Sequence, residues 1–138
     1  MTDDSLRSVS LTRLSSGQYE ATNRAGTTLR IGGEDAFSPV ELLLAAIAGC
    51  SAIDVDLITG KRAEPNRFDA TMTGDKIRDD RGNRLVNLAL RFDIEFPDDD
   101  DGRAARDVLP RALQQTHDRL CTVSRTVEVG TPVEVTEA

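Results

Sequence analysis

The stretch SPVELLLAAIAGCSAIDVDLI, residues 38–58, decides the fold of this 138-residue chain. Ser38 supplies an N-cap, Pro39 suits the first helical position and Glu41 completes a capping box, so a helix is predicted to start here. From residue 40 to residue 58, 14 of 19 residues are Ala, Val, Ile, Leu or Cys. Apolar groups therefore surround the helix instead of forming a stripe, which is typical of a helix buried on all sides.

A helix buried on every side needs more covering than a chain of this length offers. We therefore expect a second copy of the chain to supply the covering, as an obligate homodimer. A membrane is the alternative environment, but Glu41, Asp54 and Asp56 leave only 12 uncharged residues, 42–53, which are too few to cross a bilayer. No membrane partner is expected.

The segments before and after this helix alternate apolar and polar residues, as strands do. Two or three strands are expected in residues 6–31, with hairpin turns at residues 15–17 and 25–26. A long antiparallel hairpin is expected over residues 68–96, in which the run from Val86 to Phe96 alternates without interruption.

A second helix follows the acidic run Asp98–Asp101, whose negative charge suits a helix N-terminus. Its apolar residues form one face, and Pro110 lies off that face, where we expect a kink. A last strand is expected from Val127 to Val135. The fold class is therefore α+β, with mainly antiparallel sheets, a long buried central helix and a second amphipathic helix, in one domain spanning residues 1–138.

Composition and charge exclude several classes of partner and location. The net charge of −7 would repel nucleic-acid phosphates, so no nucleic-acid partner is expected. The acidic start Met1–Asp4 lacks the basic and apolar regions of a signal peptide, which indicates a cytoplasmic location. The two cysteines, Cys50 and Cys121, are too few for a disulfide framework, so reduced thiols are expected.

The two cysteines are the candidate chemical groups. Cys50 lies within the apolar helix, where a cysteine is usually a small buried hydrophobe. Cys121 precedes a polar stretch that ends at Arg125, where a thiol is partly exposed and near a cation that favours the thiolate. Asp54 follows Cys50 by one helical turn and opposes its ionisation, so an arginine from elsewhere in the chain is required.

A metal site is the alternative use of these thiols. Cys50, Cys121 and His117 are the residue types that bind zinc or iron. A single histidine at an unremarkable spacing on a polar helix is more often solvated, and we expect no metal.

The segment from Ser38 to Cys50 closely resembles the central helix of the OsmC/Ohr family of hydroperoxide-detoxifying proteins. The stretch Cys121–Arg125 resembles the second-cysteine motif of that family, and the order of strands and helices matches across nearly the whole chain. The resemblance implies an OsmC-like fold in an intertwined homodimer, with two buried helices at its centre and two active sites at the subunit interface. It implies no metal, haem, flavin or other cofactor.

The resemblance also implies the roles of the cysteines. Cys50 is the peroxidatic thiol that attacks an organic hydroperoxide, and Cys121 resolves the resulting sulfenic acid as a Cys50–Cys121 disulfide. A dithiol reductant then regenerates both thiols. Residues 21–26 are similar to the turn that carries the activating arginine of the peroxidases, which makes Arg24 the predicted activating residue and Arg30 the reserve.

One position departs from the peroxidase pattern. The peroxidases have a glutamate directly after the helix proline, whereas this chain has Val40 there and Glu41 one position later. Nine steps from Glu41 to Cys50 leave the two side chains on opposite faces of a regular helix, so Glu41 is interpreted as the capping residue. This indicates a divergent OsmC-like branch, in which the alternative function is noncatalytic binding of a small apolar or acyl ligand at the dimer interface.

Overall fold

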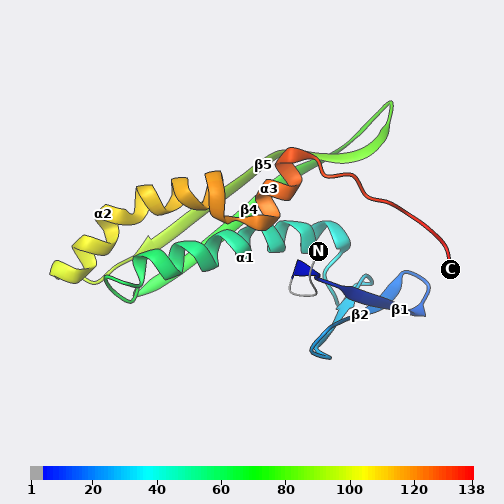
Figure 1. Ribbon diagram of the computed structural model, residues 1–138, viewed down its shortest axis with the longest axis horizontal. Helices are drawn as coiled ribbons and strands as arrows, with labels where there is room; N and C mark the ends of the chain where they lie inside the picture. The colour runs from blue at the N-terminus through cyan, green and yellow to red at the C-terminus, as the bar shows by residue number, and fades with distance from the viewer. Residues whose placement is uncertain (1–4) are drawn as a thin grey trace. The chain divides into compact units, whose positions relative to one another are not determined.

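The computed structural model describes residues 5–138, so the acidic start Met1–Asp4 and the location inferred from it lie outside the described residues. The chain forms two compact units, Met1–Leu43 and Leu44–Ala138, and its organisation as a single domain stays a prediction. The fold class is α+β with antiparallel sheets, as the sequence predicts (Figure 1).

The first unit contains a three-stranded antiparallel sheet in the order β1-β2-β3. Its strands are β1 (Val9–Ser15), β2 (Gln18–Asn23) and β3 (Thr28–Ile31). The predicted strands and both predicted turns are therefore confirmed.

Helix α1 (Pro39–Thr59) begins with the predicted capping box. The Ser38 backbone N–H donates to Glu41 Oε1 at 2.9 Å, and the Glu41 backbone N–H donates to Ser38 Oγ at 3.1 Å. Two backbone donors that the helix cannot satisfy are thus bound reciprocally, and the interpretation of Glu41 as a capping residue is confirmed.

The capping box should contribute to the stability of the folded protein. Ser38→Ala removes the oxygen that accepts the Glu41 N–H, and we expect it to lower the free energy of unfolding by about 1 kcal/mol. Urea unfolding followed by far-ultraviolet circular dichroism measures the change. Ser38→Thr, which keeps the hydroxyl, is the control, and an equal loss in both variants would contradict the capping role.

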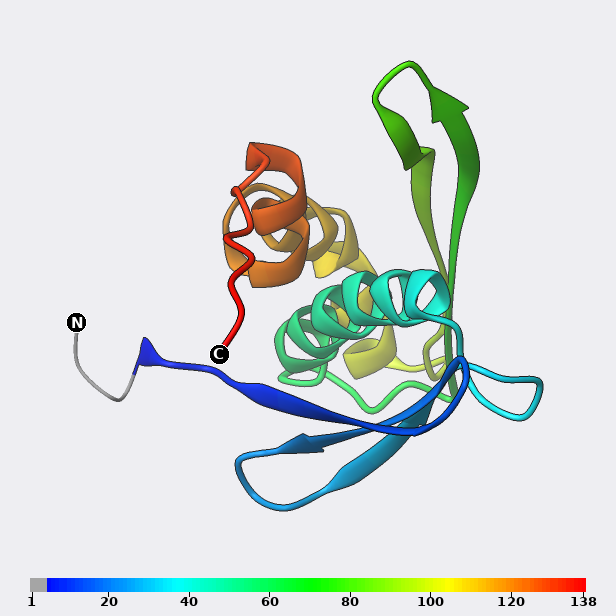
Figure 2. The same cartoon turned by 90° about the vertical axis from the view of Figure 1, so that its right-hand side faces the viewer.

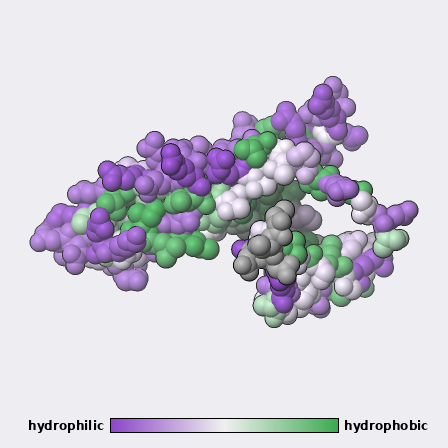
Figure 3. All heavy atoms as spheres, in the orientation of Figure 1, coloured by the Kyte–Doolittle hydropathy of each residue, from purple (hydrophilic) through white to green (hydrophobic). Residues whose placement is uncertain are grey.

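Within one chain the side chains of α1 are buried along one face only, and burial of its other faces by a second copy stays a prediction. The buried residues recur at every fourth position, and Ile53 and Leu57 on another face are 64% and 65% exposed. Apolar side chains accordingly lie along α1 at the surface (Figure 3). The reason is that one chain covers only one face of the helix, the face made by Ile47, Ser51, Val55 and Thr59.

A membrane is again the alternative environment for α1. The helix is long and apolar enough to cross a membrane, but the core helix of a soluble protein can have the same length and composition. The absence of a membrane partner therefore stays a prediction.

The second unit contains a long antiparallel hairpin of β4 (Arg67–Asp79) and β5 (Gly82–Glu95), as predicted. The alternation of β5 is interrupted at one point, because the register shifts beside Asn87, which has a φ of 54°. In Figure 2, helices α1 and α2 (Asp100–Gln115) lie on the same side of this hairpin.

Helix α2 begins where the acidic run predicts. The N-cap residue Asp99 accepts the backbone N–H of Gly102 at 2.7 Å, and two further aspartates occupy the first turn. Pro110 lies inside a continuous helix. The buried residues of α2 include Ala105 and Ala112, both on the predicted apolar face.

The predicted C-terminal strand is wrong. Val127 and Val129 belong to the helix α3 (Thr122–Val129), because Cys121 caps a helix start and Gly130, in the left-handed conformation, caps its end. Val133 and Val135 follow without regular secondary structure and are 85% and 88% exposed. Alternating valines alone do not make a strand where no neighbouring strand edge pairs with them and a helix cap precedes them.

Candidate functional site

Cys121 is placed by an irregularity between two helices. A π-helical segment, η2 (Thr116–Leu120), follows α2, and the Cys121 backbone N–H donates to the Thr116 carbonyl at 2.9 Å. Cys121 itself leaves the helical conformation, with a ψ of 100°, and becomes the N-cap of α3. The chain thus places a thiol at a helix N-terminus, where the helix dipole favours a negative charge.

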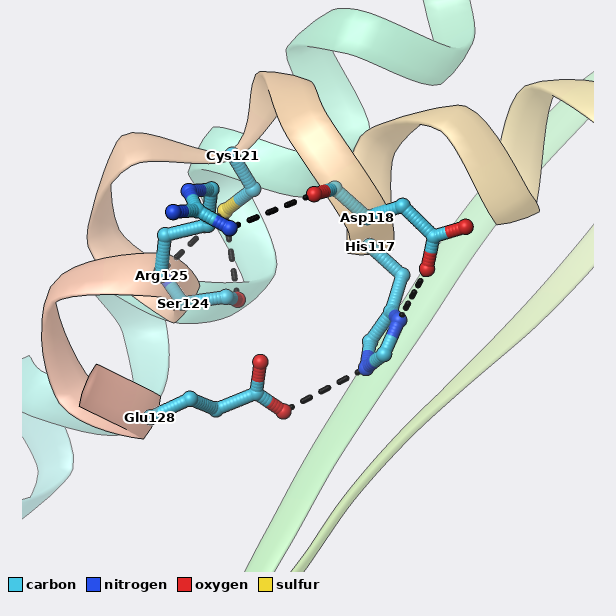
Figure 4. Close-up of polar contacts among 6 residues, drawn as sticks. All are labelled: His117, Asp118, Cys121, Ser124, Arg125 and Glu128. Atoms are coloured by element: carbon cyan, nitrogen blue, oxygen red, sulfur yellow. Dashed lines mark hydrogen bonds and ion pairs between the residues drawn. The ribbon is translucent and has the colours of Figure 1, made fainter.

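The Cys121 sulfur is enclosed by hydrogen-bonding groups. Its side chain is 0% exposed, and its Sγ lies 3.2 Å from Ser124 Oγ and accepts the Ser124 backbone N–H at 3.4 Å (Figure 4). The hydroxyl of Ser51, on α1, lies close enough to the same sulfur to lower its pKa. The serine hydroxyls rotate, so they accept from the thiol and donate to the thiolate.

Cys50 lies on α1 beside this group. It is a free, half-buried cysteine, and its thiol is within hydrogen-bonding reach of Cys121. The backbone N–H groups of Thr122 and Val123, in the first turn of α3, also interact with its sulfur. The structure therefore brings together the two thiols that the sequence singles out, although they are separated by most of the second unit.

The electrostatics of the two thiols differ. Burial raises the pKa of Cys50, and the neighbouring Cys121 raises it further, against the opposing effect of the Val123 N–H. For Cys121, burial also acts to raise the pKa, but the hydrogen bonds from Ser124, Ser51 and Cys50 outweigh it and lower the pKa. The two pKa values are therefore shifted in opposite directions, and activation of Cys50, which the family resemblance implies, stays a prediction.

The predicted activating arginines belong to the first unit. Arg24 Nη1 donates to the Leu6 carbonyl at 3.1 Å, and Arg30 on β3 is in register with Glu20 on β2. The cysteines belong to the second unit. Activation of Cys50 by Arg24 or by Arg30 stays a prediction.

The charged groups near the cysteines have partners of their own. Asp54, one turn from Cys50, accepts a hydrogen bond from Thr116 Oγ1 at 2.9 Å. Arg125 Nη1 donates to the Asp118 carbonyl at 3.3 Å. The cation that the sequence places near Cys121 is thus bound to the backbone of η2 (Figure 4).

His117 is solvent-exposed and bound between two carboxylates. Its Nδ1 lies 2.9 Å from Asp118 Oδ1 and its Nε2 lies 3.3 Å from Glu128 Oε1 (Figure 4). Both carboxylates raise the pKa of His117, Asp118 through its hydrogen bond above all. Within residues 5–138, no group of three His, Cys, Asp or Glu residues is arranged to hold a metal ion.

A largely apolar pocket of about 360 Å³ lies next to the cysteines. Ser51 and Ser124, which contact the Cys121 sulfur, line one part of it. Sequence reasoning assigned no role to these two serines, although the spacing of Cys121 and Ser124 is that of a helix N-cap and its N3 residue. The remaining walls come from the hairpin and all the helical segments: Ile47, Met72, Leu88, Leu90, Phe92, Leu109, Leu113, Thr116, His117, Val127 and Glu128.

The fold and the paired thiols define a class of protein. The sequence pattern of the OsmC-like protein family matches residues 32–136, and the chain belongs to this family. An uncharacterized protein of Mycobacterium tuberculosis strain H37Rv is 27% identical over 127 residues, which cover 89% of this chain and 90% of that protein.

Solved structures have the same fold. A hypothetical protein from Aquifex aeolicus superposes with a TM-score of 0.74 at 21% identity, covering 91% of this chain and 89% of that one. The OsmC-like protein from Mycoplasma pneumoniae gives 0.70 at 15% identity, with coverages of 91% and 89%. The organic hydroperoxide resistance protein OhrB of Bacillus subtilis gives 0.57 at 14% identity, with coverages of 88% and 90%. At these identities the likeness shows the fold alone.

Proposed function

We propose that this protein is a thiol-dependent peroxidase that reduces organic hydroperoxides to alcohols through a Cys50 sulfenic acid and a Cys50–Cys121 disulfide. The observation that carries the proposal is the placement of two free thiols within hydrogen-bonding reach of each other. A peroxidase of this kind needs one thiol to take an oxygen atom and a second thiol close enough to displace it. A dithiol reductant then returns the disulfide to two thiols.

The exposure of the two cysteines supports the division of roles. Cys50 is half-buried and Cys121 is fully buried, so a dissolved oxidant has more access to Cys50. Cys121 lies near Cys50, where a second thiol can trap the sulfenic acid before further oxidation.

The pocket supports an organic substrate. Its walls are mostly aliphatic and aromatic side chains, and its volume of about 360 Å³ is in the range of small-molecule sites. A hydrocarbon group would therefore gain free energy by leaving water for this pocket. Membership of the OsmC-like family, which includes proteins named for organic hydroperoxide resistance, supports the same substrate class and a role in oxidative stress.

We also propose that the protein is a cytoplasmic homodimer. Two large aliphatic residues of α1, Ile53 and Leu57, are about two-thirds exposed in the single chain. Exposed aliphatic groups in a row along one helix favour association, and a second copy of α1 offers a matching surface. The dimer that the family resemblance implies would cover them.

The test is a reaction of the fully reduced protein with cumene hydroperoxide. We expect the loss of one equivalent of peroxide per chain, with formation of one Cys50–Cys121 disulfide identified by mass spectrometry of proteolytic fragments. Added dithiothreitol should then sustain turnover. Thiols that remain reduced in excess cumene hydroperoxide would rule out the peroxidase.

A second candidate function rests on the same pocket. A noncatalytic protein that binds a small apolar or acyl ligand would use the apolar walls and leave the thiols unreacted. Native mass spectrometry of the purified protein distinguishes the two functions, because a retained acyl ligand together with inert thiols supports binding alone.

A further inference from the structure

The apolar pocket has charged side chains on one part of its wall. Among the described residues that line it, His117 on η2 and Glu128 on α3 are the ones that can carry a charge. Both side chains are more than half exposed, so they lie where the pocket meets solvent. The electric field in this part of the pocket is therefore set by these two residues and by the groups bound to them.

His117 is already bound to two carboxylates and offers no free nitrogen to an anion. Its Nδ1 lies 2.9 Å from Asp118 Oδ1 and its Nε2 lies 3.3 Å from Glu128 Oε1, as Figure 4 shows. When the imidazole ring is protonated, His117, Asp118 and Glu128 together carry one net negative charge, and when the ring is neutral they carry two. This part of the wall is therefore negative in either state.

The arginines of η2 and α3 do not compensate this charge inside the pocket. Arg119 and Arg125 line a separate surface recess, and Arg125 Nη1 donates to the Asp118 carbonyl at 3.3 Å. On the α1 side, the carboxylate of Asp54 accepts a hydrogen bond from Thr116, which lines the pocket. A ligand carboxylate would thus leave water without meeting an unpaired cation among the described residues of the pocket wall, and such a transfer costs free energy.

The negative charge lies close to the position that a hydroperoxide would take. Ser124 lines the pocket and its Oγ lies 3.2 Å from Cys121 Sγ, so a neutral hydroperoxide group can exchange hydrogen bonds with this hydroxyl beside the thiols. Ser124 and Glu128 are four residues apart on α3, a spacing that puts Cβ atoms about 5–6 Å apart on one face. This is less than the Debye length of about 8 Å at physiological ionic strength, so the charge of Glu128 acts on a ligand bound there.

On the basis of the proposed function, we propose that the pocket selects neutral organic hydroperoxides over hydroperoxides that carry a carboxylate, and that Glu128 is the residue that discriminates between them. Alkyl, aryl and esterified acyl hydroperoxides are then the substrate class, because their hydrocarbon groups gain from the apolar walls and bring no charge to the negative part. Ile53 and Leu57, which we assign to the dimer interface, do not line this pocket.

The test compares cumene hydroperoxide that carries a carboxylate at the para position with the methyl ester of the same acid. The two substrates differ in charge and little in shape, so the ratio of their kcat/KM values isolates the effect of charge. At about pH 7, with dithiothreitol as reductant, we expect the wild-type protein to use the ester about tenfold better than the acid, as for like charges about 6 Å apart near a protein surface. Added sodium chloride should narrow this ratio, because salt screens exposed charges.

Glu128→Gln removes the charge and keeps the shape of the side chain. It should narrow the ester-to-acid ratio by about threefold or more, and Glu128→Lys should narrow it further, because the sign of the charge is then reversed. A merely structural role of Glu128 would lower kcat/KM for the acid and the ester alike and leave their ratio unchanged. Glu134→Gln is the matched control, since it removes one negative charge at an exposed residue that does not line the pocket.

The outcomes separate this inference from the proposed function. If the wild-type protein uses acid and ester equally well, or if Glu128→Gln and Glu134→Gln change the ratio equally, the selection is wrong and the peroxidase stands. If the wild-type protein consumes none of these hydroperoxides, the proposed function is wrong. Calorimetric titration with cumyl alcohol and its para-carboxylate then still tests the pocket: the neutral alcohol should bind about tenfold more tightly. Equal affinities, or no binding of either alcohol, would overturn the inference.

Discussion

Cys50→Ser should abolish hydroperoxide consumption, with a loss of about a thousandfold or more in the rate constant for cumene hydroperoxide. A serine hydroxyl at this position has no accessible oxyanion near neutral pH and cannot form a sulfenic acid. The measurement is peroxide loss with dithiothreitol as reductant. Because position 50 lies on α1 beside Cys121, circular dichroism and elution volume must first show that the variant folds as the wild type does.

Cys121→Ser is the matched control for this prediction. It should oxidise once at Cys50 and then stop with a trapped sulfenic acid because no second thiol is available. The opposite pattern, in which Cys121→Ser is inactive at every pH and Cys50→Ser retains peroxide consumption, would reverse the roles of the two cysteines. Equal activity in all three proteins would remove both roles.

The double substitution Ile53→Asp and Leu57→Asp should convert the proposed homodimer to monomers. Each aliphatic side chain buried at an interface contributes about 1.5–3 kcal/mol, and a two-fold interface counts each residue twice. In the single chain both residues are largely exposed, so the substitutions should cost a monomer little. Size-exclusion chromatography with light scattering measures the mass of the particle.

The control for added charge is Gln114→Asp with Gln115→Asp, on exposed positions of α2. These changes add the same negative charge and should leave the mass unchanged. A wild-type protein that is monomeric at micromolar concentration would contradict the dimer before any variant is made.

Local chemistry explains why much of the fold was predictable. The Ser38–Glu41 capping box and the Asp99 cap depend on residues three apart, so their signals are present in the sequence itself. The strand alternation in residues 68–96 likewise predicted the β4–β5 hairpin, because pairing and side-chain direction follow the same period of two.

The predictions of secondary structure failed where two local sequence patterns conflict. Val127 and Val129 suggest a strand by alternation, but the cap at Cys121 starts a helix that contains them. The register shift beside Asn87 was also missed, because an alternating pattern does not reveal an extra residue in one strand.

The sequence by itself determined most of the helices and strands, the family and the two candidate thiols, because helix caps, strand periods and cysteine-containing motifs depend on neighbouring residues. Only the tertiary structure decided which groups surround the two sulfurs. The Ser124 contacts to Cys121 are local, but the Ser51 hydroxyl and the Cys50 thiol reach the same sulfur from α1, far away in sequence. Ionisation depends on burial and on every hydrogen bond to the sulfur at once, and packing alone assembles that set.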